Sequence, residues 1–335
     1  MEDVPTAETF SSSSAAELAV VERGGFVESR HAGSAIVLAP SGEVIASHGD
    51  PQALILPRSS LKPLQAIACV TAGAALEGEK LAAATASHNG TERHADLVRR
   101  MLADVGLTED ALLCPPAWPA DSDARARLTA DHGEPSRLFH NCSGKHAAML
   151  TACRASGWDT ATYLDADHPL QVHIREVVER LTGDRIAGSV IDGCGAPVHA
   201  MSLESLARGL HRAGTSAESS PFALHRVAAT LLRAVRENAW VVEGPGGDDT
   251  ATIERFGLFS KKGAEGVQVL VAPDGTTVAL KMLDGSNRAG SLVALALMAR
   301  AGVVSVADVA EAAAERPGLR VLGGGRPVGV IRAVV

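Results

Sequence analysis

The sequence is poor in aromatic residues and has no block of basic ones. Aromatic residues make up 3% of the 335 residues, with a single tyrosine, so side chains that could stack on nucleic-acid bases are scarce. Acidic residues outnumber basic ones by 39 to 31, and the formal net charge of −8 disfavours binding to a phosphate backbone. Charged residues interrupt every apolar stretch before the ~20 residues that a membrane-spanning helix needs. We therefore expect no nucleic-acid partner and no membrane partner.

The amino terminus and the cysteines indicate a protein of the cell interior. Residues 1–17 begin with Glu2 and Asp3 and lack the basic start and apolar middle of a secretion signal. We predict that this stretch is a partly disordered lead-in and that the protein is cytoplasmic. The five cysteines are odd in number and irregularly spaced. In the cytoplasm such cysteines are more often buried thiols or metal ligands than disulfide partners.

Lysine is also scarce, because six of the 31 basic residues are lysine and the other 25 are arginine. Genome composition alone can produce such a bias. A buried lysine can nevertheless lose its proton and act as a base or a ligand, whereas a guanidinium group stays charged. The lysines are therefore candidates for chemistry: Lys62, Lys80, Lys145, Lys261, Lys262 and Lys281.

Strand-like patterns lie toward both ends of the chain, and helical patterns dominate between them. The strand-like stretches are 18–23, 34–38, 44–47, 256–260, 267–272, 276–283 and 328–335. The helical stretches are about 59–238, 287–301 and 305–315. Short strands joined by hairpin turns favour antiparallel pairing. We predict an α+β fold in which 18–58 and 240–335 form one antiparallel sheet flanked by helices, with 59–239 as a mainly helical insertion.

The sharpest local motif is Ser59-Ser60-Leu61-Lys62, an S-x-x-K arrangement at the start of the first helical stretch. Residues three apart share a helical face, so Ser59 and Lys62 can touch. A serine hydroxyl becomes a good nucleophile when a neighbour takes its proton, and a desolvated neutral lysine can do this. The plain alternative is a capping serine followed by an exposed lysine, and the motif alone favours that alternative.

A second motif, Lys261-Lys262-Gly263, follows a strand-like stretch. In serine β-lactamases and penicillin-binding proteins, a strand with such a K-x-G tripeptide lines the site opposite the nucleophile's helix. Two lysines that face one cavity lower each other's pKa, and burial acts in the same direction. An exposed Lys-Lys turn is the alternative. Because the S-x-x-K motif lies upstream, we favour an active site that contains a neutral lysine base.

Two further blocks contain residue types that bind metals. His140–His146 includes Cys142 and Lys145, and Asp192–Gly195 includes Cys194. Two cysteines with nearby histidines can bind zinc. The spacing matches no zinc finger, so spacing alone leaves metal binding open. The block 86–90, which contains Ser87 and His88, is typical of a turn or a helix cap.

Taken together, these blocks resemble the L-asparaginase II family, the rhizobial-type or thermolabile class 3 asparaginases. The resemblance runs in order over about residues 17–335, nearly the whole chain. The blocks at 140–146 and 192–195 are the most specific to the family. The stretches that carry the resemblance are 58–63, 86–90 with His94, 140–146, 191–195, 261–266 and Lys281 with 284–286.

The resemblance implies a serine β-lactamase or glutaminase-like fold. It also implies hydrolysis of L-asparagine to L-aspartate and ammonia. In such an enzyme Ser59 is the nucleophile and Lys62 accepts its proton. A second Ser–Lys pair is formed by Ser87 and Lys261.

The resemblance further implies a zinc ion held by Cys142, Lys145 and Cys194, which helps to hold the substrate and does not supply the nucleophile. The lysine ligand must lose its proton to bind. A homodimer is also typical of the family. The residues implied for substrate binding are Arg58, His88, Asn89, Asp192, Gly193 and Ala264.

Two departures from the family pattern and three other functions stay open. The loop Glu243–Thr250 lacks the arginine expected there, which leaves the substrate contacts of that loop open. Lys261 and Lys262 are adjacent, so the choice of Lys261 depends on the K-x-G register. The other functions are a glutaminase, a metal-dependent amidohydrolase in which zinc activates water, and a penicillin-binding-like sensor that is acylated without turnover.

Overall fold

The computed structural model describes residues 8–335, and residues 1–7 of the predicted lead-in lie outside the described residues. Phe10 is 5% exposed and packs into the larger apolar core. Strand β1 begins at Ala16. The folded chain therefore starts before position 18, because an apolar side chain anchors it ahead of the first strand.

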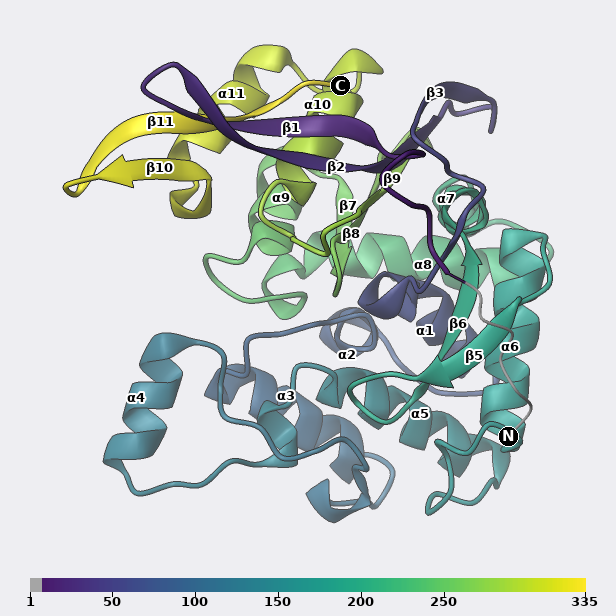
Figure 1. Ribbon diagram of the computed structural model, residues 1–335. Helices are drawn as coiled ribbons and strands as arrows, with labels where there is room; N and C mark the ends of the chain where they lie inside the picture. Colours follow the sequence, from purple (N-terminus) through teal and green to yellow (C-terminus); the bar gives the residue numbers. More distant parts are fainter. Residues whose placement is uncertain (1–7) are drawn as a thin grey trace.

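Within residues 8–335, eight strands form one antiparallel sheet in the order β10-β11-β1-β2-β9-β8-β7, with β3 paired to β2 (Figure 1). The strands are β1 Ala16–Arg23, β2 Phe26–Leu38, β3 Val44–His48, β7 Phe259–Gly263, β8 Val267–Val271, β9 Thr277–Met282, β10 Arg320–Gly323 and β11 Arg326–Ala333. Strands from the two ends of the chain are neighbours, since β1 pairs with β11 and β2 pairs with β9. The predicted α+β class, with one sheet built from both ends, is confirmed.

Helices cover both faces of this sheet: α10 and α11 lie on one face, and α7 lies on the other, with α1 and α8 beyond it (Figure 1). The helices are α1 Lys62–Thr71, α2 Gly78–Ala83, α3 Glu92–Ala103, α4 Ser122–Ala130, α5 Ser143–Ser156, α6 Pro169–Thr182, α7 Leu203–Gly214, α8 Ala223–Glu237, α9 Asp248–Phe256, α10 Gly290–Arg300 and α11 Val306–Glu315. Among these described helices, none is both long and apolar enough to cross a bilayer.

The covered sheet separates two apolar cores. Successive side chains of a strand point to opposite faces, so Val269 packs into the core beside the helical insertion while Leu270 packs toward α10. All five residues of β8 are buried. A strand that is covered on both faces needs no polar side, and this explains the nearly continuous apolar run in the sequence.

One predicted strand is displaced in the structure. We predicted a strand over 256–260, whereas α9 extends to Phe256 and β7 begins at Phe259. Gly257 ends the helix in the left-handed conformation, with φ 65°, as glycine commonly does. The strand therefore begins three residues later than predicted, and β7 contains Lys261, Lys262 and Gly263.

The helical insertion also contains strands that the sequence analysis missed. β5 (Gly188–Ile191) and β6 (Pro197–Ser202) form an antiparallel pair, and β4 (Leu54–Ile55) joins β6. Strands this short leave little alternation to detect. The small sheet holds the loop that contains residues 192–195 between β5 and β6.

Candidate active site

The start of the helical insertion touches the edge strand of the main sheet. The 3₁₀ turn η1 (Arg58–Leu61) contains Ser59, leads directly into α1 and contacts β7. Gly263 lies at this contact: a Cβ there would stand 2.5 Å from the Pro57 carbonyl oxygen and 3.3 Å from the Ser60 amide nitrogen. Because any side chain would force the two segments apart, the K-x-G motif needs its glycine for packing.

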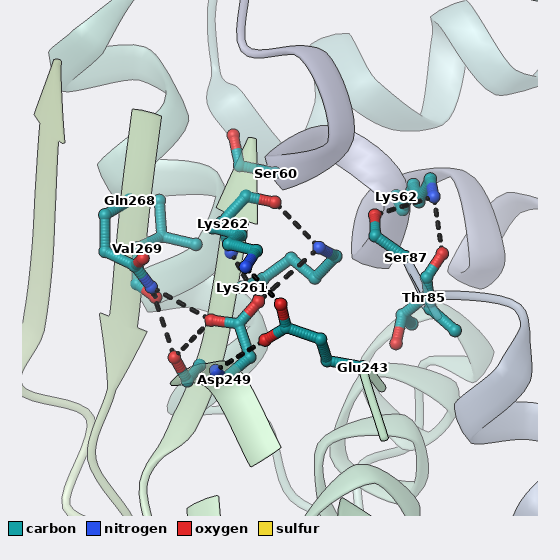
Figure 2. Close-up of polar contacts among 12 residues, drawn as sticks. Ser60, Lys62, Thr85, Ser87, Glu243, Asp249, Lys261, Lys262, Gln268 and Val269 are labelled. Carbon is teal, nitrogen blue, oxygen red and sulfur yellow. Dashed lines mark hydrogen bonds and ion pairs between the residues drawn. The ribbon is translucent and has the colours of Figure 1, made fainter. Parts of the chain in front are cut away.

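Lys62 is a buried amine at the centre of the site. It is 1% exposed, and Nζ donates to the Ser87 hydroxyl at 3.0 Å and to the Ala86 carbonyl (Figure 2). The Ser87 N–H donates in turn to the Val242 carbonyl at 2.9 Å. Ser59 is half-buried one turn before Lys62, and its carbonyl oxygen accepts the Lys62 N–H. The hydroxyl bonded to the Lys62 amine is thus that of Ser87.

Lys261 is fully buried, and its side chain points toward Ser87 and Lys62 (Figure 2). Burial lowers the pKa of Lys261 to about 8, and the positive charge of Lys62 acts in the same direction. Nζ donates to the Lys262 carbonyl at 2.7 Å. The second Ser–Lys pair implied by the resemblance is therefore not a direct hydrogen bond here. Lys262 itself is half-buried, so Lys261 is the member of the pair that lies inside.

Arg58 and Asp192 meet although they are 134 residues apart. Arg58 Nε donates to Asp192 Oδ1 at 2.7 Å, and the Gly193 N–H donates to the same oxygen at 2.8 Å. Burial disfavours the charged carboxylate, but these donors outweigh burial and lower the pKa of Asp192. Arg58 has φ 51°, a conformation that costs a non-glycine residue on the order of 1–3 kcal/mol. The ion pair thus fixes a strained residue directly before Ser59.

Cys142, Lys145 and Cys194 form a buried cluster. Cys142 caps the start of α5, Lys145 lies in its first turn, and Cys194 comes from the β5–β6 loop. Lys145 Nζ lies 3.1 Å from Cys194 Sγ. A hydrogen bond with Cys194 lowers the pKa of Cys142 well below its usual value against the effect of burial, and the charges of Lys62 and Lys145 contribute. His146 Nε2 is buried and has no hydrogen-bond partner among the described residues.

This donor set suits a zinc ion. Two cysteine sulfurs and a lysine amine are groups that zinc accepts. In the part of the chain that the structure describes, no three His, Cys, Asp or Glu side chains form a metal-binding group, and the amine beside Cys194 is that of Lys145. Burial disfavours the charge on Lys145, but Cys194 and Cys142 outweigh it and raise the pKa of Lys145. A zinc ion bound through this amine would have to displace a proton.

The remaining predicted substrate residues lie on two neighbouring segments. His88 Nε2 lies 2.9 Å from the Ser143 hydroxyl, and Nδ1 accepts the Gly90 N–H at 3.1 Å. Burial lowers the pKa of His88 well below its usual value, so the ring is neutral and supports the loop. Asn89 Oδ1 is buried with no hydrogen-bond partner among residues 8–335. Ala264 is half-buried in the turn after β7.

Two carboxylates that the sequence analysis missed lie near the two lysines: Glu243 in the loop before α9 and Asp249 in the first turn of α9. Glu243 pairs with Lys262 and accepts the Asp249 N–H at 3.0 Å. Asp249 is buried, and its Oδ2 lies 3.7 Å from Lys261 Nζ. The loop that lacks the expected arginine therefore provides acids that face the two adjacent lysines. The two adjacent lysines could have predicted these acids, because lysines on a buried strand require opposite charges nearby.

The sequence model of the L-asparaginase II family matches residues 19–333. This match supports an amidohydrolase. The chain belongs to the L-asparaginase II family. None of the curated proteins compared with it matches.

Three solved structures are similar to the chain at low sequence identity. A structure of Mglu is 13% identical, with a TM-score of 0.44, over 82% of this chain and 68% of that chain. A structure of Mglu in its glutamate form has the same identity and TM-score over 82% of this chain and 61% of that chain. A beta-lactamase from Mycobacterium bovis is 15% identical, with a TM-score of 0.40, over 80% of this chain and 94% of that chain. The chain thus spans 61–68% of these two Mglu chains, and the family assignment rests on the sequence match.

Proposed function

We propose that the protein hydrolyses the side-chain amide of L-asparagine to give L-aspartate and ammonia, with Ser59 as the nucleophile. The observation that carries this proposal is the contact of β7 with η1. Two buried lysines lie at this contact: Lys261 on β7, and Lys62 at the start of the helix that follows Ser59. Membership of the family supports the amidohydrolase class. A cytoplasmic location and a homodimer, the latter implied by the resemblance, are part of the proposal.

In the proposed reaction the Ser59 oxygen attacks the carboxamide carbon, and its proton passes to the Lys62 amine, which acts as the base. Backbone N–H groups near Ser59 and Ala264 hold the oxyanion, and such a donor lowers a barrier by about 3–4 kcal/mol where it has been measured. Ammonia leaves with a proton delivered by Lys261 or through Ser87, which already accepts a hydrogen bond from Lys62. Water then hydrolyses the β-aspartyl ester, which releases L-aspartate and restores the serine.

The charged groups around Ser59 suit the two ends of an amino acid. Arg58 offers a positive charge for the α-carboxylate, and Asp192 offers a negative charge for the α-ammonium group. Cys142, Lys145 and Cys194 would hold zinc, which supplies a positive charge that helps to bind the substrate. None of the bond-making steps above requires the metal.

Ser59→Ala tests the proposed nucleophile. Ammonia release from asparagine should fall by at least about a thousandfold, because no other group forms the ester. Ser60→Ala is the matched control, since the Ser60 hydroxyl donates to the Pro57 carbonyl at 2.7 Å and takes no part in the reaction. Full activity in Ser59→Ala, with activity lost on chelation, would support the alternative in which zinc activates water. Parallel assays with glutamine decide between asparaginase and glutaminase.

Cys194→Ser tests the proposed metal site. Loss of one thiolate should reduce bound zinc to well below one ion per chain, measured by metal analysis of purified protein, and ammonia release should fall with it. Cys153→Ala removes a buried thiol in the interior of α5 and should leave the zinc content unchanged. Equal zinc contents in wild-type protein and Cys194→Ser would contradict this ligand set.

A further inference from the structure

Asp249 and Lys261 form a buried pair of opposite charges at the edge of the main sheet. Asp249 is 1% exposed and Lys261 is 0% exposed. Asp249 Oδ2 lies 3.7 Å from Lys261 Nζ (Figure 2). Among the described residues, no other carboxylate lies within 4.0 Å of this amine. The chain thus buries one negative charge specifically beside this lysine.

Several donors fix the Asp249 carboxylate in place. Oδ1 accepts the Ser260 hydroxyl at 2.7 Å and the Gln268 amide at 3.2 Å, and Oδ2 accepts the Lys262 N–H at 2.9 Å. β7 is an edge strand, so the carboxylate bonds a backbone N–H that no further strand reaches. Asp249 also lies in the first turn of α9, where the helix dipole favours negative charge. These contacts favour an ionised, rigid carboxylate.

Charged groups of both signs face Lys261 from the elements around it. Asp249 comes from α9, Glu243 from the loop before α9, Lys62 from α1, and Lys262 is the next residue of β7. Burial lowers the pKa of Lys261 to about 8, Asp249 opposes this most strongly, and Lys62 adds to the lowering. Without Asp249 the amine would face burial and two neighbouring lysines, with Glu243 as the remaining acid nearby.

We propose that Asp249 is a positioning residue for Lys261 in the reaction proposed above: its carboxylate holds the amine in place and keeps it protonated near neutral pH. A protonated Lys261 can give its proton to the departing ammonia. Lys62, by contrast, donates to a hydroxyl and a carbonyl, and among the described residues no carboxylate lies within 4.0 Å of its amine. The two lysines therefore differ in role, with Lys62 as the acceptor of the Ser59 proton and Lys261 as the donor to the leaving group.

The small number of lysines makes a direct test practical. Protein labelled with ¹³C at the lysine Cε gives six resonances, and the one missing from Lys261→Met belongs to Lys261. The titration midpoint of this resonance is then compared between the wild-type protein and Asp249→Asn. We expect the midpoint to fall by about one to three pH units in the variant. The pH profile of ammonia release should move to lower pH by the same amount.

Two control variants separate the charge of Asp249 from its structural contacts. Ser260→Ala removes a hydrogen bond to Asp249 but keeps the charge, so the Lys261 midpoint should stay near its wild-type value. Glu243→Gln neutralises the carboxylate that pairs with Lys262 and should lower the Lys261 midpoint less than Asp249→Asn does. If Asp249→Asn does not fold, Asp249→Ser, which leaves room for a water molecule, provides the same comparison.

An unchanged Lys261 midpoint in the neutral variant, or an equal fall in Ser260→Ala, overturns the proposal. A shifted midpoint with an unshifted activity profile overturns the link between Asp249 and the reaction. If wild-type protein releases no ammonia from asparagine, the proposed function fails. The NMR titration still decides the role of Asp249 in that case, because it needs no turnover.

Discussion

Lys261 on β7 and Leu280 on β9 are both completely buried, but they lie on opposite faces of the same sheet. Burying a leucine side chain stabilises a fold by about 1.5–3 kcal/mol. Burying an ammonium group costs several kcal/mol unless an opposite charge and hydrogen bonds offset the loss of water. The burial of Leu280 therefore stabilises the fold. The burial of Lys261 lowers the stability of the fold and places a reactive amine in the candidate site.

Among the variants that test this difference between the two faces, Lys261→Met should have the largest effect on activity. Ammonia release should fall by at least about a hundredfold, because the proton donor for the leaving group is gone. Asp249 keeps three hydrogen bonds in this variant, so the free energy of unfolding should change less than in Leu280→Ala, where a core cavity costs about 2–5 kcal/mol. Denaturant unfolding and ammonia release, measured on both variants, check the two parts. An active Lys261→Met variant would show that the buried amine is not needed for the reaction.

Gly263→Ala tests the contact that joins the sheet to the nucleophile's turn. The added Cβ would lie 2.5 Å from the Pro57 carbonyl oxygen, so β7 and η1 must separate. We expect the free energy of unfolding to fall by about 1–3 kcal/mol, and ammonia release to fall as Lys261 and Ser59 move apart. Gly318→Ala is the matched control, because a Cβ there meets nothing within 4 Å and the backbone needs no positive φ. Equal stability and activity in the two variants would show that the contact is loose.

Asp192→Asn, which removes the charge paired with Arg58, gives the smallest expected effect on stability. The loss of the charge beside Arg58 should lower the free energy of unfolding by about 1 kcal/mol at neutral pH. The folded state lowers the pKa of Asp192, so its contribution is present above the unfolded pKa of about 4 and is lost as the pH falls through the lowered value. Unfolding measured from pH 7 to pH 2 should show the two proteins converging. A constant difference across that range would mean that the charge contributes nothing.

Local sequence patterns predicted much of the fold because the packing of this sheet follows local periodicity. The strands at 267–271 and 277–282 and the helix at 306–315 agree with the predicted stretches within one residue at each end. The start of β7 was misplaced because α9 continues to Phe256, and only the left-handed Gly257 marks its end. β4 and β5 were missed because strands of two and four residues carry too little pattern, and β6 lies within the stretch that was predicted to be mostly helical.

The candidate site was harder to predict from the sequence, because its contacts join residues that are far apart in the chain. The lowered pKa of Lys261 follows from burial and a second lysine, and both were anticipated from the two motifs. The bond from Lys62 to Ser87 was not anticipated, since it depends on the path of the 86–90 loop. Asp249 was missed because an acid in the first turn of a helix ordinarily serves as an exposed end residue. Its burial depends on β7 being an edge strand, a property of the assembled sheet.

The pairing of β1 with β11 has a consequence for how the chain reaches its native state. Ala19 lies opposite Ala333, so this ladder closes a loop of more than three hundred residues. Ends that are so far apart along the backbone meet slowly, since the entropy of closing the loop is lost before the contacts of the ladder offset it. Folding should therefore be limited by the meeting of the two ends, and the helical insertion, whose contacts are more local, should acquire structure earlier.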